Sequence, residues 1–322
     1  MRRITTHSNK RHVFAHQEEI MRLLKTLFVL ALVANGAAAA ELTGTLQKIK
    51  ETNRIAIGFQ EGSVPFSYLD ANQKPVGYSL DVCQKIVDAV KKELNLPNLD
   101  VTYTPLTAAN RIPLLMNGTV DMHCSSATNS AERQKQITFV NSYFVTANRF
   151  LSKKTSNIRK IEDLKGKTVV SVAGSTNIAG LSRINAERNL GLNIVAAKDQ
   201  LEAFLMLETD RAQAYVLDDV QLAVAAARSK TPNAYVVSEE ALSKPEPAGI
   251  MVRKNDPQFK ALADRVTAAL YQSPEIEAIY KKWFQSPVPP NGINFNYPMP
   301  SGLLNAFKKP SSSADPDAYA DH

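Results

Sequence analysis

Residues 55–59 read IAIGF, residues 79–94 read SLDVCQKIVDAVKKEL and residues 101–103 read VTY. The first and last runs are short, apolar or β-branched, and typical of strands. The middle run has a capping serine at its start and apolar residues at helical spacing: Cys83, Ile86, Val87, Val90 and Leu94. Strand, helix and strand in this order predict a parallel α/β sheet.

The same alternation continues and then starts again. A helix at 110–116 and a strand at 119–124 complete a first α/β unit. A second unit over roughly 150–245 contains predicted strands at 168–172, 194–196 and 214–217, with helices from 176 to about 190 and at 201–207. A strand at 248–252 and a helical stretch at 258–284 follow. This pattern favours two lobes crossed twice by the chain over one large sheet.

Length and composition suit a globular protein of two domains, with 322 residues, 44% hydrophobic and 21% charged. The formal net charge of +7 is unevenly distributed. Residues 1–40 hold six of the 38 basic residues and two of the 31 acidic ones, which leaves 32 against 29 and a net charge of +3. A balanced remainder without a basic block argues against nucleic acid as a partner. No apolar seam calls for an oligomer, so we expect a monomer.

The N-terminus is typical of an export signal. Met21 to Lys25 is a basic start, residues 26–34 are an apolar run too short to span a bilayer, and Ala37 to Ala40 offer a signal-peptidase site. We predict a signal peptide over 21–40, preceded by an N-terminal extension. Because no cysteine lies at the cleavage site, a lipid anchor is not expected. The sequence therefore predicts a soluble protein of the periplasm.

Signatures of enzymes and metal sites are missing from the sequence. It has no Walker loop, no glycine-rich dinucleotide loop, no nucleophile elbow and no cluster of ligating residues at metal spacing. We expect no catalytic residue, no metal and no cofactor. His123, the one histidine left besides His322 after signal removal, is interpreted as a structural residue. Cys83 and Cys124 are either one disulfide or two buried thiols, because sequence does not give their distance.

Polar residues also follow a strand of the first unit. Residues 125–133 read SSATNSAER and enter a helix, with Asn129 and Glu132 at the spacing of a cap and its partner. Hydroxyls and free N–H groups at a helix N-terminus attract an anion, and Arg133 can bind a carboxylate through two hydrogen bonds. The spacing alone favours an ordinary capped helix with a solvated arginine.

The second unit has matching features. Gly174-Ser175-Thr176-Asn177 again lies between a strand and a helix, and Asp218-Asp219 follows another strand, where a carboxylate can hold an ammonium group. Each feature alone is a weak signal. Together they predict a cleft with anion sites and a cation site, which a zwitterionic amino acid would need.

Six motifs add a resemblance: SVPFSY at 63–68, GYSLD at 77–81, NRIPLL at 110–115, TNSAERQK at 128–135, DLKGK at 163–167 and KKWF at 281–284. Their combination resembles the polar-amino-acid binding proteins of ATP-binding-cassette (ABC) importers, most closely the periplasmic glutamate/aspartate-binding branch. The similarity covers residues 44–309. It implies a type II periplasmic-binding-protein (Venus-flytrap) fold, in which two lobes, each a five-stranded sheet flanked by helices, are joined by two hinge strands.

The resemblance also implies roles for single residues. Those that would clamp the ligand α-carboxylate are Arg133, Ser126 and Thr128. Asp218 would take the α-ammonium group, and Thr176 with Ser175 would close from the second lobe. Arg111 matches the arginine that reaches the side-chain carboxylate in binders of acidic amino acids.

Three positions depart from the pattern of the acidic-amino-acid binders. Gln60 stands where an arginine is usual, Ala108 where a serine is usual and Gln200 where a histidine is usual. A buried carboxylate needs charged or strong donors, whereas glutamines can both donate to and accept from an amide. Glutamate or aspartate is favoured as the ligand, and glutamine, asparagine or another polar amino acid is the alternative. In either case Arg111, Gln60 and Gln200 are expected to contact the side chain of the ligand.

The expected boundaries follow from the two units and the resemblance. The first lobe is expected to comprise 41–148 and 247–310, and the second lobe 149–246. Residues 311–322 are rich in Ser and Asp and are predicted to form a flexible tail.

The implied function is capture of an amino acid by lobe closure and its delivery to an ABC permease in the inner membrane. Two rivals differ in class from transport. One is a sensor that signals to a receptor kinase. The other is an exported dehydratase of the same fold, for which Glu61 or His123 would be the general acid or base.

Overall fold

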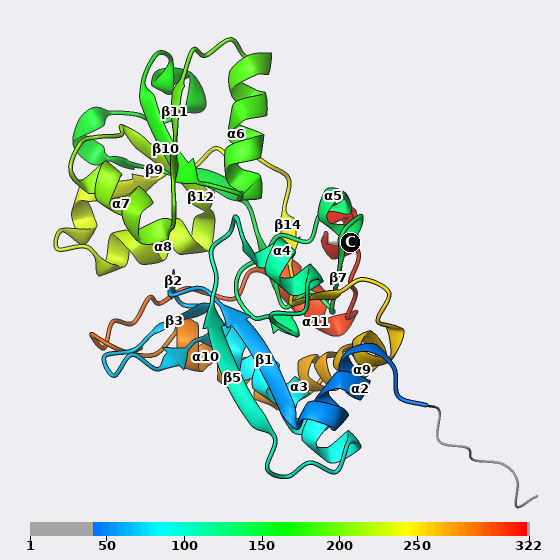
Figure 1. Ribbon diagram of the computed structural model, residues 1–322. Helices are drawn as coiled ribbons and strands as arrows, with labels where there is room; N and C mark the ends of the chain where they lie inside the picture. Colours follow the sequence, from blue (N-terminus) through cyan, green and yellow to red (C-terminus); the bar gives the residue numbers. More distant parts are fainter. Residues whose placement is uncertain (1–40, 321–322) are drawn as a thin grey trace, which may run out of the picture. The chain divides into compact units, whose positions relative to one another are not determined.

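The computed structural model describes residues 41–320, which from Thr43 on pack as one compact unit. The predicted signal peptide and N-terminal extension lie outside the described residues. Two five-stranded sheets form the framework of this unit (Figure 1). Across residues 41–320, no helix combines the length and the apolar character that crossing a membrane requires.

The first sheet has the strand order β5-β1-β6-β15-β7. Strand β1 (Arg54–Phe59) pairs in parallel with β5 (Asp100–Pro105) and with β6 (Met122–His123). Strand β15 (Met251–Arg253) runs antiparallel between β6 and β7 (Ile137–Phe139). We call this sheet and the helices packed on it lobe 1.

The helices of lobe 1 include α2 (Gly44–Thr52), α3 (Tyr78–Glu93), α4 (Arg111–Met116), α9 (Pro257–Tyr271) and α10 (Pro274–Phe284). Helix α3 packs against α9 and α10, and α4 packs against β6 and β15. The predicted apolar stripe of α3 is buried at Cys83, Ile86, Val87 and Val90. A small sheet of β2 (Gly62–Ser63), β3 (Ser67–Leu69) and β4 (Pro75–Val76) lies between β1 and α3 in the chain.

The second sheet has the strand order β11-β10-β12-β9-β13 and is the centre of lobe 2. Its strands are β9 (Asn148–Lys153), β10 (Thr168–Val172), β11 (Asn193–Ala197), β12 (Ala214–Asp218) and β13 (Tyr235–Val237). The three strands β10, β11 and β12 are parallel, and β9 is antiparallel to both β12 and β13.

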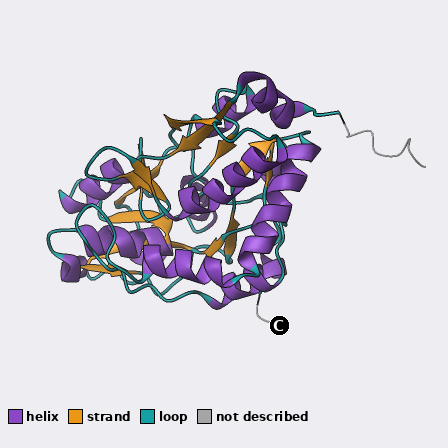
Figure 2. Ribbon diagram, turned by 90° about the horizontal axis from the view of Figure 1, so that it is seen from below, coloured by secondary structure: helices purple, strands orange, loops and turns teal. Residues whose placement is uncertain are grey.

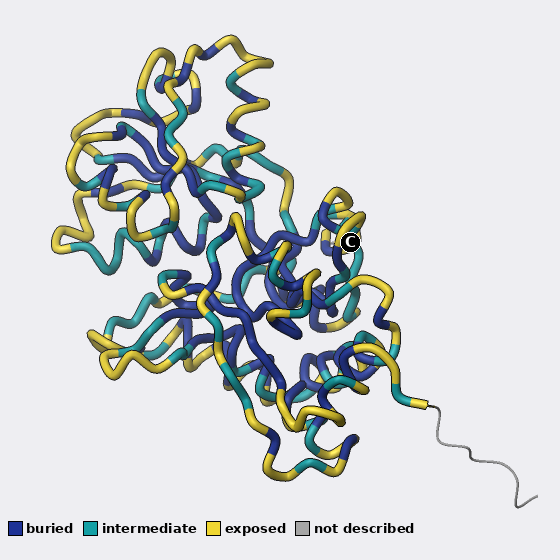
Figure 3. The backbone as a smooth tube through the Cα atoms, in the orientation of Figure 1, coloured by how far each residue is buried: buried dark blue, intermediate teal, exposed yellow. Residues whose placement is uncertain are grey.

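Helices cover both faces of the second sheet. Residues of α7 (Gln200–Glu208) and α8 (Asp219–Arg228) share one apolar cluster with Val170 and Leu217. Helix α6 (Thr176–Glu187) shares another with Val169 and the opposite face of β12. The central strands β1, β6, β10 and β12 are accordingly largely buried, whereas the edge strands β5 and β11 are more exposed (Figures 2 and 3). The predicted α/β class with two lobes is confirmed.

The two crossings between the lobes lie side by side. Strand β8 (Phe144–Thr146), which leads into β9, pairs antiparallel with β14 (Glu246–Ala248), which leads back to β15. This pair is the two-stranded hinge that the resemblance implies.

Several predicted elements differ in their extent or their cap, and the strand predicted at 119–124 is only β6, two residues long. The helical stretch 258–284 is broken into α9 and α10, because Ser273 caps a new helix through its hydroxyl and Pro274 occupies the first turn. The strand predicted at 248–252 is interrupted between β14 and β15. Helix α5 (Ala131–Gln134) is capped by Ser130, which accepts from Arg133 N, and not by Asn129 as predicted.

The C-terminal segment also differs from the prediction of a flexible tail from Ser311. After α11 (Ser301–Lys308), the chain folds back on lobe 1 as far as Ala320. Tyr319 is buried, and its hydroxyl donates to Ser313 O at 2.8 Å and bonds to Ser142 Oγ at 2.9 Å. Asn129 Nδ2 donates to Ser312 O at 3.0 Å. One buried aromatic ring and these hydrogen bonds hold a segment whose composition predicts disorder.

Candidate functional site

Strands of both sheets end at one cavity between the lobes. Gln60 follows β1, Ser126 follows β6 within three residues, Ser175 follows β10, and Asp218 is the last residue of β12. Ligands of α/β proteins bind beyond the carboxyl ends of the strands, where the loops diverge. The topology therefore directs the polar residues of both lobes to the same place.

This cavity has a free volume of only about 20 Å³, because the two lobes are closed over it. Lobe 1 lines it with Gln60, Ala108, Arg111, Ser126 and Thr128. Lobe 2 lines it with Val172, Ser175, Thr176, Asn177, Gln200, Leu217, Asp218 and Gln221. The structure thus brings together all the sequence-predicted ligand residues except Arg133.

Arg111 is the positive charge in the wall of the cavity. It is 3% exposed, and its Nη1 donates to Ser126 O at 2.8 Å, while its Nε has no hydrogen-bond partner within the described residues. Burial and the neighbouring charge of Arg133 lower the pKa of Arg111 well below its usual value. A buried cation with an unused donor favours an anionic ligand, since a carboxylate would supply both the missing charge and the missing acceptor.

Arg133 lies behind the cavity wall, on the hinge side. Its Nη1 donates to Thr128 O at 2.9 Å, and its Nη2 donates across the cleft to Gly174 O at 3.5 Å. It lines a neighbouring, larger cavity of about 580 Å³ together with the hinge residue Glu246. Burial lowers the pKa of Arg133 to about 10, although Asp218 and Glu246 favour its charged form.

Asp218 is the carboxylate that faces Arg111 from the other lobe. It is 6% exposed and accepts a hydrogen bond of 2.8 Å from Asn177 Nδ2. Burial, and then the nearby carboxylate of Glu246, raise the pKa of Asp218 to about 7. An ammonium group placed beside it would lower that pKa and be held as an ion pair.

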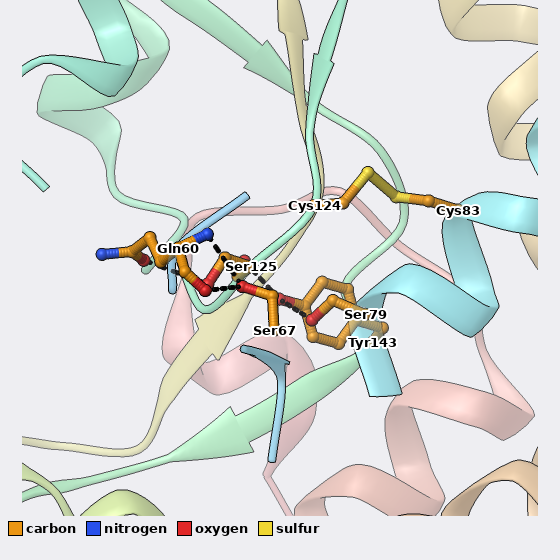
Figure 4. Close-up of a disulfide and its surroundings, with 7 residues drawn as sticks. All are labelled: Gln60, Ser67, Ser79, Cys83, Cys124, Ser125 and Tyr143. Carbon is orange, nitrogen blue, oxygen red and sulfur yellow. Dashed lines mark hydrogen bonds between the residues drawn. A yellow bond between two sulfur atoms is a disulfide. The ribbon is translucent and has the colours of Figure 1, made fainter. Parts of the chain in front are cut away.

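Gln60 is fixed by its neighbours at the base of the cavity (Figure 4). Its Oε1 accepts from Ser125 Oγ at 3.0 Å, and its backbone is bonded to Ser67 Oγ. The side-chain nitrogen points away from Ser125 and from the disulfide, so its N–H groups are available to a ligand.

Cys83 and Cys124 form a disulfide, which settles the choice that the sequence left open. The bond joins α3 to the residue after β6, immediately before Ser125 and Ser126 (Figure 4). It therefore anchors the loop that presents lobe 1 to the cavity.

The two lobes touch around the cavity. Thr128 Oγ1 and Thr176 Oγ1 lie 2.9 Å apart, and Gln221 Nε2 donates to Ser63 Oγ at 2.9 Å. Gly174 has φ +74°, and a Cβ atom there would lie 2.6 Å from Ala109 Cα in lobe 1. A closed arrangement of the lobes requires glycine at this position.

The residues considered for catalysis do not line the cavity. His123 lies within β6, fully buried, with no hydrogen-bond partner for either ring nitrogen within residues 41–320. Burial, with Arg111 and Arg133 nearby, lowers the pKa of His123 well below its usual value, which keeps the ring neutral. Glu61 is exposed. Over the same residues, no group of His, Cys, Asp and Glu is arranged to hold a metal ion.

Two polar lining residues were not assigned from the sequence. Asn177 belongs to the 174–177 stretch and bonds to Asp218, and it also donates to Asn148 Oδ1. Gln221 lies three residues after Asp218, so the first turn of α8 places it on the same side. That helical spacing was the available signal.

Comparison with known proteins gives consistent matches. The model of the family "bacterial extracellular solute-binding proteins, family 3" matches residues 55–286. The L-glutamate/L-aspartate-binding protein of Pseudomonas aeruginosa is 48% identical over 293 residues, 91% of this chain and 97% of that protein. The glutamate/aspartate import solute-binding protein of Escherichia coli is 42% identical over 292 residues, 89% and 96% of the two chains. Among solved structures, a mutant of ArgBP from T. maritima matches with TM-score 0.66 and 28% identity, over 74% of this chain and 99% of that one.

Proposed function

This chain belongs to family 3 of the bacterial extracellular solute-binding proteins, and we propose that it captures an acidic L-amino acid, glutamate or aspartate, for import. The relatives that cover about nine-tenths of the chain are named as binding proteins and not as enzymes. We take the choice of glutamate or aspartate from the names of these relatives, and the charged residues of the cavity support it.

The observation that carries the proposal is that Arg111 and Asp218 line one cavity from opposite lobes. An α-amino acid presents a carboxylate and an ammonium group, and each finds an opposite charge there. In the proposed complex, Asp218 takes the ammonium group, and Ser126 and Thr128 take the α-carboxylate with Arg133. Serine and threonine of the second lobe, at 175 and 176, close over it.

The side chain of the ligand would lie toward Arg111, Gln60 and Gln200. Arg111 then neutralises the second carboxylate, and the two glutamines add neutral donors. Burying both carboxylates needs this charge, because an unpaired buried carboxylate costs several kcal/mol.

Closure of the two lobes would prepare the ligand for delivery to the transporter. The open protein would bind ligand on one lobe, and bending of the hinge of β8 and β14 would bring the other lobe over it. We propose that the closed monomer then docks on an ABC permease from the periplasm. Export to that compartment would depend on the signal peptide predicted over 21–40, and no nucleic acid is involved.

A thermal-shift panel on the ligand-free chain from residue 41 onward tests the proposal. A ligand at about 100 times its dissociation constant adds about 2.7 kcal/mol and moves the unfolding midpoint by several degrees. L-glutamate and L-aspartate should shift it, whereas L-arginine should not. A shift with L-glutamine and L-asparagine alone would contradict the acidic ligand and favour an amide. No shift with any amino acid would contradict amino-acid binding itself.

A further inference from the structure

A second cavity continues the ligand cavity toward the opposite side from the hinge. It has a free volume of about 210 Å³ and shares three lining residues with the first cavity: Gln200, Leu217 and Gln221. Both lobes contribute to it, lobe 1 through Gly62 and Val64. The two cavities are therefore adjacent compartments of one cleft, and the second is the larger.

The second compartment holds a cation without a counter-ion. Arg228, the last residue of α8, lines it and is half-buried. Within residues 41–320 its guanidinium makes no hydrogen bond or ion pair, and the phenol of Tyr68 is the one group whose charge acts on its pKa. Burial lowers the pKa of Arg228 from its usual value, as expected for a cation that lacks a carboxylate partner.

A second polar group in this compartment also lacks a partner. The ring of Tyr215 on β12 is fully buried, and its hydroxyl has no hydrogen-bond partner within the described part of the chain. Buried hydroxyls are normally hydrogen-bonded, so an unused one in a cavity wall is a place for a ligand acceptor. The rest of the wall includes the apolar side chains of Phe204 and Val224.

Three neutral amides stand at or near the junction of the compartments. Gln200 and Gln221 line both cavities, and Gln60 lines the first with its N–H groups unused by Ser125. Gln221 donates across the cleft to Ser63 Oγ, and this contact lies between the two cavities. Primary amides can both donate and accept, so they suit an amide link of a ligand better than a charged group.

We propose that the cleft also accepts α-amino acids whose side chain continues through an amide link to a terminal carboxylate, as in a γ-glutamyl dipeptide. The amino-acid head would occupy the first cavity, so the inference rests on the proposed function. The link would lie against the glutamines after Gln221 releases Ser63. The terminal carboxylate would pair with Arg228 and accept from the hydroxyl of Tyr215.

The test is calorimetric titration of the ligand-free chain with two probes that differ in one charge. γ-L-Glutamylglycine carries the terminal carboxylate, and γ-L-glutamylglycinamide does not. The acid should bind at least about tenfold more tightly, because a charged acceptor on a half-buried arginine is stronger than a neutral one. Arg228→Gln should remove this difference. The matched control Arg211→Gln, at an exposed arginine of the same lobe, should keep it.

The outcomes separate the two proposals. If L-glutamate binds but neither dipeptide does, or if wild-type protein binds both dipeptides equally, the second compartment is not a ligand site. If Arg228→Gln folds and still prefers the acid, Arg228 is not its partner. If neither glutamate nor aspartate binds, the proposed function fails first, and a dipeptide that still bound would identify the extended ligand as the sole substrate.

Discussion

Asn177 donates a hydrogen bond of 2.8 Å to Asp218 Oδ1 inside the cleft, from the first turn of α6 to the end of β12. This bond favours the ionised carboxylate. Burial and the charge of Glu246 oppose it and prevail, so the pKa of Asp218 is raised to about 7. At neutral pH the carboxyl group of Asp218 is therefore near the midpoint of its titration when no ligand is bound, so ligand binding should depend on pH.

Affinity for an amino acid should depend on pH through Asp218. An ammonium group pairs with the ionised carboxylate, so binding releases a proton below pH 7 and needs no such release well above it. Affinity should fall by up to about tenfold per pH unit below the pKa of about 7 and level off above it. Calorimetry in buffers of different ionisation enthalpy measures both effects. Asp218→Asn should bind weakly with a flatter profile, and an unchanged wild-type affinity between about pH 5 and 8 would contradict the assignment.

Arg133 gives a test of the carboxylate clamp. The structure bonds it to Thr128 O and Gly174 O, so its role requires the guanidinium to reach the ligand through or around this contact. Arg133→Ala should cost about 2–5 kcal/mol of binding free energy, as for other buried charged contacts. The control Arg183→Ala changes an exposed arginine that lines the same hinge-side cavity. Equal affinity of the two variants would remove Arg133 from the site.

Two glycines make it possible to distinguish an effect on lobe closure from an effect of backbone strain. Gly174 and Gly166 have nearly the same φ, +74° and +72°, but a Cβ atom would meet Ala109 of the other lobe at Gly174 and nothing within 4 Å at Gly166. Gly174→Ala and Gly166→Ala should therefore lower the free energy of unfolding by a similar amount, about 1 kcal/mol. Gly174→Ala should in addition weaken ligand binding, because its methyl group obstructs closure. Small-angle scattering with ligand would show the difference, and a fully closing Gly174→Ala would disprove it.

The disulfide should contribute substantially to stability. Cys83 and Cys124 are 41 residues apart, and closing a loop of this length in the unfolded chain corresponds to about 4 kcal/mol in the chain-entropy description. The double variant Cys83→Ser/Cys124→Ser should lose a free energy of unfolding of this order in urea titrations. Wild-type protein under reducing conditions should show a similar loss. A change below about 1 kcal/mol would mean that the bond is dispensable for the fold.

The fold was predictable because its signals are local. The apolar stripe of α3 and the short apolar runs determine the alternation of strands and helices. The break between α9 and α10 also has a local signal, Ser273-Pro274, although 258–284 was predicted as one continuous helical stretch. The tail was mispredicted for the opposite reason. It is rich in Ser and Asp, and the contact of Tyr319 with Ser142 joins residues 177 positions apart.

The candidate site was predictable in its members and less so in its geometry. Topology brings Gln60, Ser126 and Asp218 together, because each follows or ends a strand that points to the cleft. Sequence spacing does not show where the end of a long side chain lies. It placed Arg133 near the site but could not show that its guanidinium donates to Thr128 O outside the cavity wall. The disulfide and the second compartment depend on distances across the fold, which a sequence does not contain.

The folded-back C-terminal segment makes the end of the chain a natural position for an optical reporter. Asp317 lies 3.8 Å from Lys244 in an exposed ion pair, and Lys244 belongs to the segment that leads into hinge strand β14. A solvent-sensitive dye at 317 would sit beside the moving joint while remaining outside the ligand cavity. Bending of the hinge would alter its emission, and the protein itself could then measure the concentration of its ligand.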